Sequence, residues 1–216
     1  MILYYITDSR QLGSHELLLE KIAEAAAAGV DYIQLRERDL PTRQLEMLSA
    51  EAVAAVRRSG SQTKLLINSR VDVALAVGAD GVHLRSNDMA ASEARAIWAE
   101  SSGRTDCVIG VSCHSLHDVL SAEGHGADFV VFGPVFGKLG STEPPLGLAA
   151  LTQVVNRGNP PDPKVEAGQS LRMPVIALGG VTLASAADCA RVGAAGVAAI
   201  RMFQERKISE IVGRLK

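Results

Sequence analysis

The hydrophobic positions of this chain form short continuous runs, separated by segments in which apolar and charged residues mix. Apolar runs stand at 2–7, 64–68, 107–112 and 174–179. Continuous rather than alternating runs are typical of parallel strands that are buried on both faces. Between them, segments such as 16–28 and 42–58 carry apolar residues at helical spacing with charges on the other positions. The pattern predicts strands that alternate with helices.

A second pattern recurs four times. An Ala-rich or helix-favouring stretch ends in glycine, and a small residue and a β-rich apolar run follow; the glycines are Gly29, Gly78, Gly126 and Gly193. Glycine suits the position just past a helix because it accepts a positive φ. With the four runs above, this gives eight strands, each followed by a helix. We therefore predict an α/β fold of one domain, an eightfold β/α (TIM) barrel. A doubly wound open sheet is the alternative, and no GxGxxG follows the first strand to favour it.

One segment departs from this rhythm. Residues 156–173 are rich in Pro, Gly and Asn and lie between the predicted sixth helix and seventh strand. We interpret them as a surface excursion within a single domain of residues 1–216, on the face opposite the chemistry of a barrel.

The composition limits the kinds of partner and the cellular compartment that we expect for this protein. The 216 residues are 47% hydrophobic, which is enough for a sizeable core, and the formal net charge is −2. Such a charge does not favour nucleic acid or an anionic membrane as partner. The three cysteines have no paired spacing, and neither a signal peptide nor a membrane-spanning run is evident, so we expect a reduced, cytoplasmic protein. A homo-oligomer is compatible with the sequence.

Polar residues gather where the predicted strands end, which is where a barrel forms its active site. Gln34, Arg36 and Arg38 share one face of the second strand because side chains alternate with a period of two. Two guanidinium groups directed into the mouth suit a carboxylate or a phosphate. Asn68 ends the third strand and is a further candidate for binding substrate, whereas His83 on the fourth strand is interpreted as a residue of the barrel interior.

The residues that follow the last two predicted strands indicate a phosphate site. Gly179 and Gly180 follow the seventh strand, and Ile200 and Arg201 follow the eighth. Backbone amides at these two places often bind phosphate in barrels, although two glycines can also simply form a tight turn. The long glycine-rich loop 133–147 carries Lys138 and is predicted to cover the mouth, with an ordinary surface loop as the alternative.

The stretch 108–118 offers two kinds of chemistry. His114 follows the fifth strand and is a candidate acid/base residue, while Cys113, His114 and His117 together resemble a set of zinc ligands. The zinc hypothesis is weaker because a strand followed by a turn separates these side chains and no fourth ligand is evident. Ser115 is predicted to cap the next helix, with His117 in its first turn.

Several of these motifs occur in a familiar order. ITD, IQLRER, INSRVDVALAVGADGVHL, IGVSCHS, GADFVVFGPVF, PPLGL, PVIALGG and VGAAGVAAI span nearly the whole chain. Together they resemble the thiamin phosphate synthase/TenI superfamily. The resemblance implies a β/α barrel, a small phosphorylated thiazole as ligand and a role in making thiamin.

The resemblance also bears on which reaction is expected. Synthases of this superfamily usually have lysine where this chain has Arg38, an acidic residue where it has Ser69, and a T-x-T-K segment near 138–141, where the chain reads KLGS. Asp88 alone matches a magnesium position, and Arg201 stands where serine is common. We therefore expect a member of the TenI branch, a thiazole tautomerase that needs no metal. The resemblance then makes His114 the proton-transferring residue, with Arg36, Arg38 and Lys138 holding the substrate's carboxylate and phosphate.

Two alternatives stay open. One is a thiamin phosphate synthase, which joins hydroxymethylpyrimidine pyrophosphate to thiazole phosphate and uses Mg²⁺, with Asp88 as a metal ligand. The other is a non-catalytic regulator that binds thiazole or thiamin phosphate on a retained barrel, because a fold does not fix a function.

Overall fold

The computed structural model describes residues 1–137, 144–157 and 173–216. Eight parallel strands close into a barrel in which each strand pairs with the next along the chain and β8 returns to β1. The strands are β1 (Ile2–Ile6), β2 (Tyr32–Leu35), β3 (Lys64–Asn68), β4 (Gly81–Leu84), β5 (Val108–Cys113), β6 (Phe129–Phe132), β7 (Val175–Leu178) and β8 (Gly196–Ala199). The predicted eightfold barrel is confirmed, and the open doubly wound sheet is excluded.

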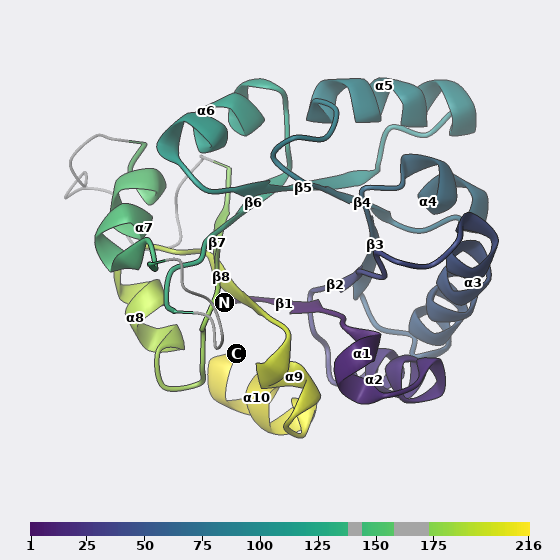
Figure 1. The fold of residues 1–216 in the computed structure, drawn as a ribbon, viewed down its shortest axis with the longest axis horizontal. Coiled ribbons are helices and arrows are strands. Elements are labelled where there is room, and N and C mark those ends of the chain that lie inside the picture. Colours follow the sequence, from purple (N-terminus) through teal and green to yellow (C-terminus); the bar gives the residue numbers. More distant parts are fainter. Residues whose placement is uncertain (138–143, 158–172) are drawn as a thin grey trace.

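Helices surround the strands, as Figure 1 shows. They are α1 (Ser9–Leu12), α2 (His15–Ala27), α3 (Thr42–Arg58), α4 (Val71–Val77), α5 (Ala91–Ser102), α6 (Leu116–Gly124), α7 (Gly147–Val155), α8 (Ala186–Arg191), α9 (Arg201–Gln204) and α10 (Ile208–Leu215). The single-turn helices α1 and α9 follow β1 and β8 and were not predicted, because four residues are too few to show a helical period. No described helix is long and apolar enough to cross a membrane.

The recurring glycines lie where the sequence predicts them. Gly29, Gly78, Gly126 and Gly193 all have positive φ, between 63° and 93°, and each follows a helix and precedes a strand. The strand bounds differ from the predicted runs by at most a residue or so at each end, as is usual for such boundaries. Of the predicted excursion at 156–173, residues 158–172 lie outside the described part of the chain, so its conformation stays a prediction.

Each strand divides its side chains between two cores. One face packs against the helices, and the other fills the barrel interior with a buried cluster that includes Tyr4, Leu66, Phe129 and Ile176. Tyr4 and Phe129 meet edge to face with their ring centroids 5.4 Å apart. Gly110 gives these rings room, because a Cβ there would lie 2.5 Å from the Phe129 ring. The interior is therefore filled by side chains, and the space for a ligand lies at the mouth.

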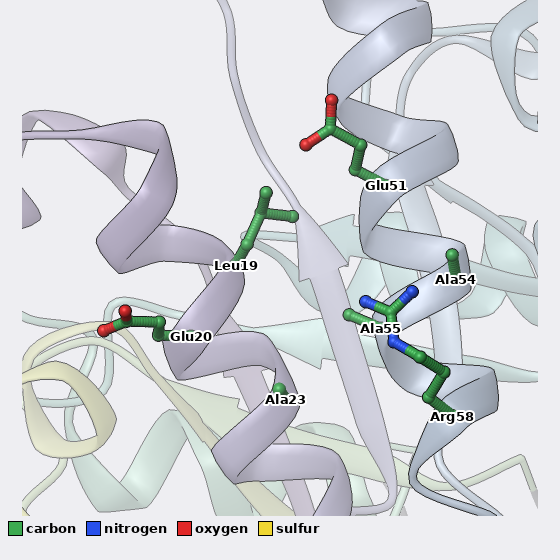
Figure 2. A pocket seen from close by; sticks show the side chains of 7 residues that line it. All are labelled: Leu19, Glu20, Ala23, Glu51, Ala54, Ala55 and Arg58. Atoms are coloured by element: carbon green, nitrogen blue, oxygen red, sulfur yellow. The ribbon is translucent and has the colours of Figure 1, made fainter.

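A groove on the outside of the barrel lies between α2 and α3. Figure 2 shows Leu19 on α2, and Glu51 and Arg58 on α3, among the side chains that line it. None of the predicted site residues lies there. The groove thus stands apart from the strand ends, and its exposed Arg58 serves below as a control position.

Candidate functional site

The mouth of the barrel is cationic on the side of β2. Gln34 lies on the interior face of this strand and is buried, Arg36 follows it half-buried, and Arg38 is exposed at the rim. Among the described residues, the guanidinium groups of Arg36 and Arg38 have no hydrogen-bonding or ion-pair partner. Burial and the nearby charge of Arg38 lower the pKa of Arg36, although a guanidinium remains protonated at neutral pH. The predicted pair of arginines thus lies at the mouth with unused hydrogen-bond donors.

The acidic residues beside these arginines are engaged elsewhere. Glu37 accepts hydrogen bonds from the backbone N–H of Ser9 at 3.2 Å and from its hydroxyl at 2.5 Å. Asp39 forms an ion pair with Arg10. Thr7 supports the same corner, because its Oγ1 accepts from the backbone N–H of Arg36 at 3.0 Å. The end of β1 and the short helix α1 therefore engage these carboxylates, which make no ion pair with the arginines although their charges act to raise the pKa of Arg36.

A chain of polar side chains crosses the barrel interior. The Tyr4 hydroxyl lies 3.0 Å from Nδ1 of His83, and Nε2 of His83 lies 2.9 Å from Oγ of Ser112. His83 is only 2% exposed. Burial and, next, the positive charge of Arg36 lower the pKa of His83 to about 3, against a smaller opposing effect of Asp88. The interpretation of His83 as an interior residue is confirmed, and it is neutral at physiological pH.

Gln34 belongs to the same interior layer. Its Nε2 is buried and makes no hydrogen bond of ordinary geometry among the described residues, although Gln34 lies close enough to Tyr4 to act on the pKa of that hydroxyl. A buried donor without an acceptor costs about 1–3 kcal/mol, so such groups usually meet water or a ligand. The observation fits the predicted role of Gln34 in binding substrate.

Asp88 lies on the neighbouring side of the mouth and is tied to protein donors. Its Oδ2 accepts from Ser69 Oγ at 2.6 Å and from the backbone N–H of Arg85 at 2.8 Å. Its Oδ1 accepts from Nη2 of Arg85 at 2.9 Å. Burial raises the pKa of Asp88, but the hydrogen bonds from Arg85 and Ser69 outweigh this and hold it below the usual value. Asn68 also reaches this corner, with Nδ2 3.2 Å from Ser69 Oγ.

His114 follows β5 and is exposed. Its Nδ1 lies 2.6 Å from the backbone carbonyl of Gly133, so Nδ1–H donates to that oxygen in the neutral ring and Nε2 is left as the acceptor. Its backbone N–H donates to Asp118 at 2.8 Å. Cys113 is buried, whereas His117 is exposed on α6. The described residues contain no group of three His, Cys, Asp or Glu side chains that could hold a metal ion, so the zinc hypothesis finds no support.

The predicted cap of α6 is confirmed. Ser115 Oγ accepts from the backbone N–H of Asp118 at 3.1 Å, and the Asp118 carboxylate accepts from Ser115 N–H at 3.0 Å. We predict that Ser115→Ala lowers the free energy of unfolding by about 1 kcal/mol, because it removes this cap. Urea unfolding at neutral pH measures the loss. Ser115→Asp is the matched control, since it keeps an N-cap oxygen, and an equal loss in both variants would contradict the prediction.

The end of β7 lies beside the loop that follows β6. The backbone N–H of Val135 donates to Leu178 at 2.7 Å, and that of Phe136 donates to Gly179 at 2.8 Å. Gly179 and Gly180 have positive φ, and a Cβ on Gly180 would lie 2.5 Å from the Gly137 oxygen. No acceptor among the described residues takes the backbone N–H of Gly180.

The other predicted phosphate ligands follow β8. Ile200 precedes the single-turn helix α9, whose first residue is Arg201, and the Arg201 guanidinium has no partner in the described part of the chain. Lys138 lies outside the described residues, so its predicted place over the mouth stays a prediction.

Sequence reasoning missed three features of the mouth. It missed the Tyr4–His83–Ser112 chain, the support of Arg36 by Thr7, and the pairing of Arg85 with Asp88. The first was accessible in principle, because Tyr4, Gln34, His83 and Ser112 occupy interior positions by strand alternation. The other two depend on side-chain conformations at strand ends, which no periodicity specifies.

The fold and the mouth define a β/α barrel whose strand ends carry cationic groups that have no partner in the described part of the chain. The family model described as thiamine monophosphate synthase matches residues 3–203, and the chain belongs to this family. It is 42% identical, over 92% of its length and 84% of the relative's, to a Geobacter sulfurreducens protein described as "Putative thiamine-phosphate synthase". It is 34% identical to the thiamine-phosphate synthase of Roseiflexus castenholzii, over 92% and 79% of the two chains.

A solved structure agrees with these relatives. The thiamine phosphate pyrophosphorylase from Pyrococcus furiosus superposes with a TM-score of 0.76 and 30% identity, over 99% of this chain and 93% of that one. These findings contradict the predicted thiazole tautomerase, an isomerase, and favour the synthase, a transferase. The error arose because the departures at Arg38 and Ser69 were given more weight than the rest of the chain. The placement nearer the TenI branch is not supported by these relatives.

Proposed function

We propose that this protein is a thiamin phosphate synthase, which joins hydroxymethylpyrimidine pyrophosphate to thiazole phosphate and releases pyrophosphate. The observation that carries the proposal, beside the family, is the half-buried Arg36, whose guanidinium has no partner among the described residues. An unpaired cation that is partly removed from water is costly unless an anion binds it. Both substrates and both products of the proposed reaction carry a phosphate or pyrophosphate group that a guanidinium can bind.

The arginines of β2 are proposed to stabilise the leaving group. As the bond to pyrophosphate breaks, negative charge develops on the pyrophosphate oxygens. Fixed positive groups stabilise this charge and so lower the free energy of the transition state. Arg36 is suited to this because partial burial weakens solvent screening, and Arg38 adds a second positive charge at the rim. Gln34, with its unused Nε2, and Asn68 are proposed to contact the pyrimidine substrate on the same side.

The thiazole phosphate is proposed to bind at the ends of β7 and β8. The backbone N–H of Gly180, which has no acceptor among the described residues, and the first turn of α9, after Ile200, supply amide donors, and Arg201 supplies charge. His114 lies at the end of β5, where its Nε2 has no partner among the described residues, and we propose that it contacts substrate there. Lys138, outside the described residues, is also proposed to bind substrate. None of these contacts needs His114 to transfer a proton.

The resemblance implies Mg²⁺, and the residues at the matching position do not fit a bound cation. Mg²⁺ requires carboxylate oxygens directed at an open octahedral position. Among the described residues, Asp88 is the carboxylate at this position, and its two oxygens accept hydrogen bonds from Ser69 and Arg85. We therefore derive no step through a protein-bound magnesium ion.

The test is the reaction itself. Purified protein is incubated with hydroxymethylpyrimidine pyrophosphate and thiazole phosphate, and chromatography follows thiamin phosphate and pyrophosphate. We expect the two products in equal amounts, because one bond to pyrophosphate breaks for each bond formed to the thiazole. Absence of thiamin phosphate at saturating substrates, in protein that still binds both, would refute the proposal and leave a non-catalytic binding protein.

A further inference from the structure

We propose that Arg85, held by the carboxylate of Asp88, is an anion-binding group that stands where a divalent cation would otherwise bind. The ligand class is a pyrophosphate, bound without magnesium. Naming the ligand rests on the proposed function, whereas the presence of an anion site at this corner does not.

The first step is the geometry of the carboxylate. Oδ2 of Asp88 accepts from Ser69 Oγ and from the Arg85 backbone, and Oδ1 accepts from Nη2 at 2.9 Å and from Nε at 3.2 Å of Arg85. A cation at this carboxylate would have to displace the guanidinium or lie against it. Because guanidinium and cation both carry positive charge, they compete for the same oxygens. The charge of Asp88 is thus already balanced within the protein.

The second step is the role of Ser69. It has a positive φ of 60°, and its backbone N–H donates to the carbonyl of His83 at 2.9 Å, which brings its side chain close to the end of β4. There the hydroxyl donates to Asp88. A carboxylate in this place would repel Asp88 unless a cation lay between them. The hydroxyl therefore suits a corner whose positive charge comes from an arginine.

The third step is what remains available for a ligand. Nη1 of Arg85 has no acceptor among the described residues, and the side chain is 56% exposed. Arg85 continues the interior-facing positions of β4, two residues after His83. The charges of Arg36 and Asp88 both act on the pKa of His83. The corner that carries Arg36 and the corner that carries Asp88 and Arg85 therefore both lie close to the His83 imidazole. A ligand with two linked phosphates matches two guanidinium groups on neighbouring parts of one rim.

The experiment measures binding and does not depend on turnover. Inorganic pyrophosphate is titrated calorimetrically into purified protein in excess EDTA. We expect wild-type protein to bind it and Arg85→Gln to bind it about tenfold more weakly, since one charge-assisted contact is lost. Arg70→Gln is the matched control, because the Arg70 guanidinium is already engaged by Asp72 and Thr42. The control is expected to keep wild-type affinity.

A second titration tests the metal directly. Magnesium chloride alone, at millimolar concentration, is titrated into wild-type protein and into Asp88→Asn. We expect no binding that depends on Asp88. A magnesium site lost in Asp88→Asn would overturn the proposal, as would pyrophosphate binding that requires magnesium or an unchanged affinity in Arg85→Gln. If Arg85→Gln weakens pyrophosphate binding but the protein forms no thiamin phosphate, the proposed function fails and this inference stands.

Discussion

We expect Arg36→Gln to lower kcat/KM for the proposed formation of thiamin phosphate by about 10²–10³-fold, the loss that follows removal of one preorganised donor to developing negative charge. The physical reason is the position of Arg36, half-buried at the mouth with no partner in the described structure. Initial rates with each substrate varied in turn measure the loss. A few-fold change or less would contradict the assignment of Arg36 to the reaction.

The same substitution has an opposite effect on stability. Gln removes a partly desolvated charge whose burial and nearby Arg38 outweigh the favourable charges of Asp8, Glu37 and Asp39, so we expect Arg36→Gln to unfold at an equal or higher temperature than wild type. Thermal unfolding of both proteins tests this and shows that lost activity does not reflect lost structure. Arg36→Lys should recover part of the activity, since it keeps the charge but not the forked pair of donors.

A matched control separates this effect from a general change in charge. Arg58 is exposed on α3 and lines the groove outside the barrel, away from the strand ends (Figure 2). Arg58→Gln changes the net charge by the same amount as Arg36→Gln. Activity within about twofold of wild type is expected, because exposed charges at a distance are screened by salt.

The architecture was predictable because a parallel barrel requires a clear pattern of hydrophobic residues and glycines in the sequence. Strands buried on both faces read as continuous apolar runs, and the helix ends need a residue that accepts positive φ, as at Gly78 and Gly193. The residues at strand ends were predictable for the same reason, since alternation along β2 places Gln34 and Arg36 on one face. Their partners were not, because hydrogen bonds such as those of Glu37 with Ser9 join segments far apart in sequence.

The reaction was the part that the sequence reasoning got wrong. Single positions, Arg38 and Ser69 above all, were taken to decide between a tautomerase and a synthase. Yet side chains at a rim can be replaced by others that supply the same charge, as the guanidinium of Arg85 beside Asp88 illustrates. The absence of a carboxylate at one position therefore indicates how charge is balanced there. It is weaker evidence about which reaction the protein catalyses.

The buried imidazole of His83 makes stability depend on pH. Its pKa in the folded protein is about 3, whereas an unfolded chain binds this proton near pH 6.5. Below that value the unfolded state therefore holds more protons than the folded state, so stability is complete above pH 6.5 and falls as the pH drops towards 3. The slope is about 1.4 kcal/mol for each pH unit, which predicts a loss of about 2 kcal/mol at pH 5.

Urea unfolding at pH 7 and pH 5 measures this loss against His83→Gln, which cannot titrate but keeps polar atoms near Tyr4 and Ser112. We expect the variant to be less stable at pH 7 and to lose about 2 kcal/mol less than wild type between the two pH values. His117→Gln, at an exposed position, should keep the wild-type pH dependence. Nuclear magnetic resonance of the His83 ring gives an independent reading, because its signals should stay constant from pH 8 to about pH 4.5. Titration of that ring near pH 6.5 would contradict a neutral, desolvated imidazole at the centre of the barrel.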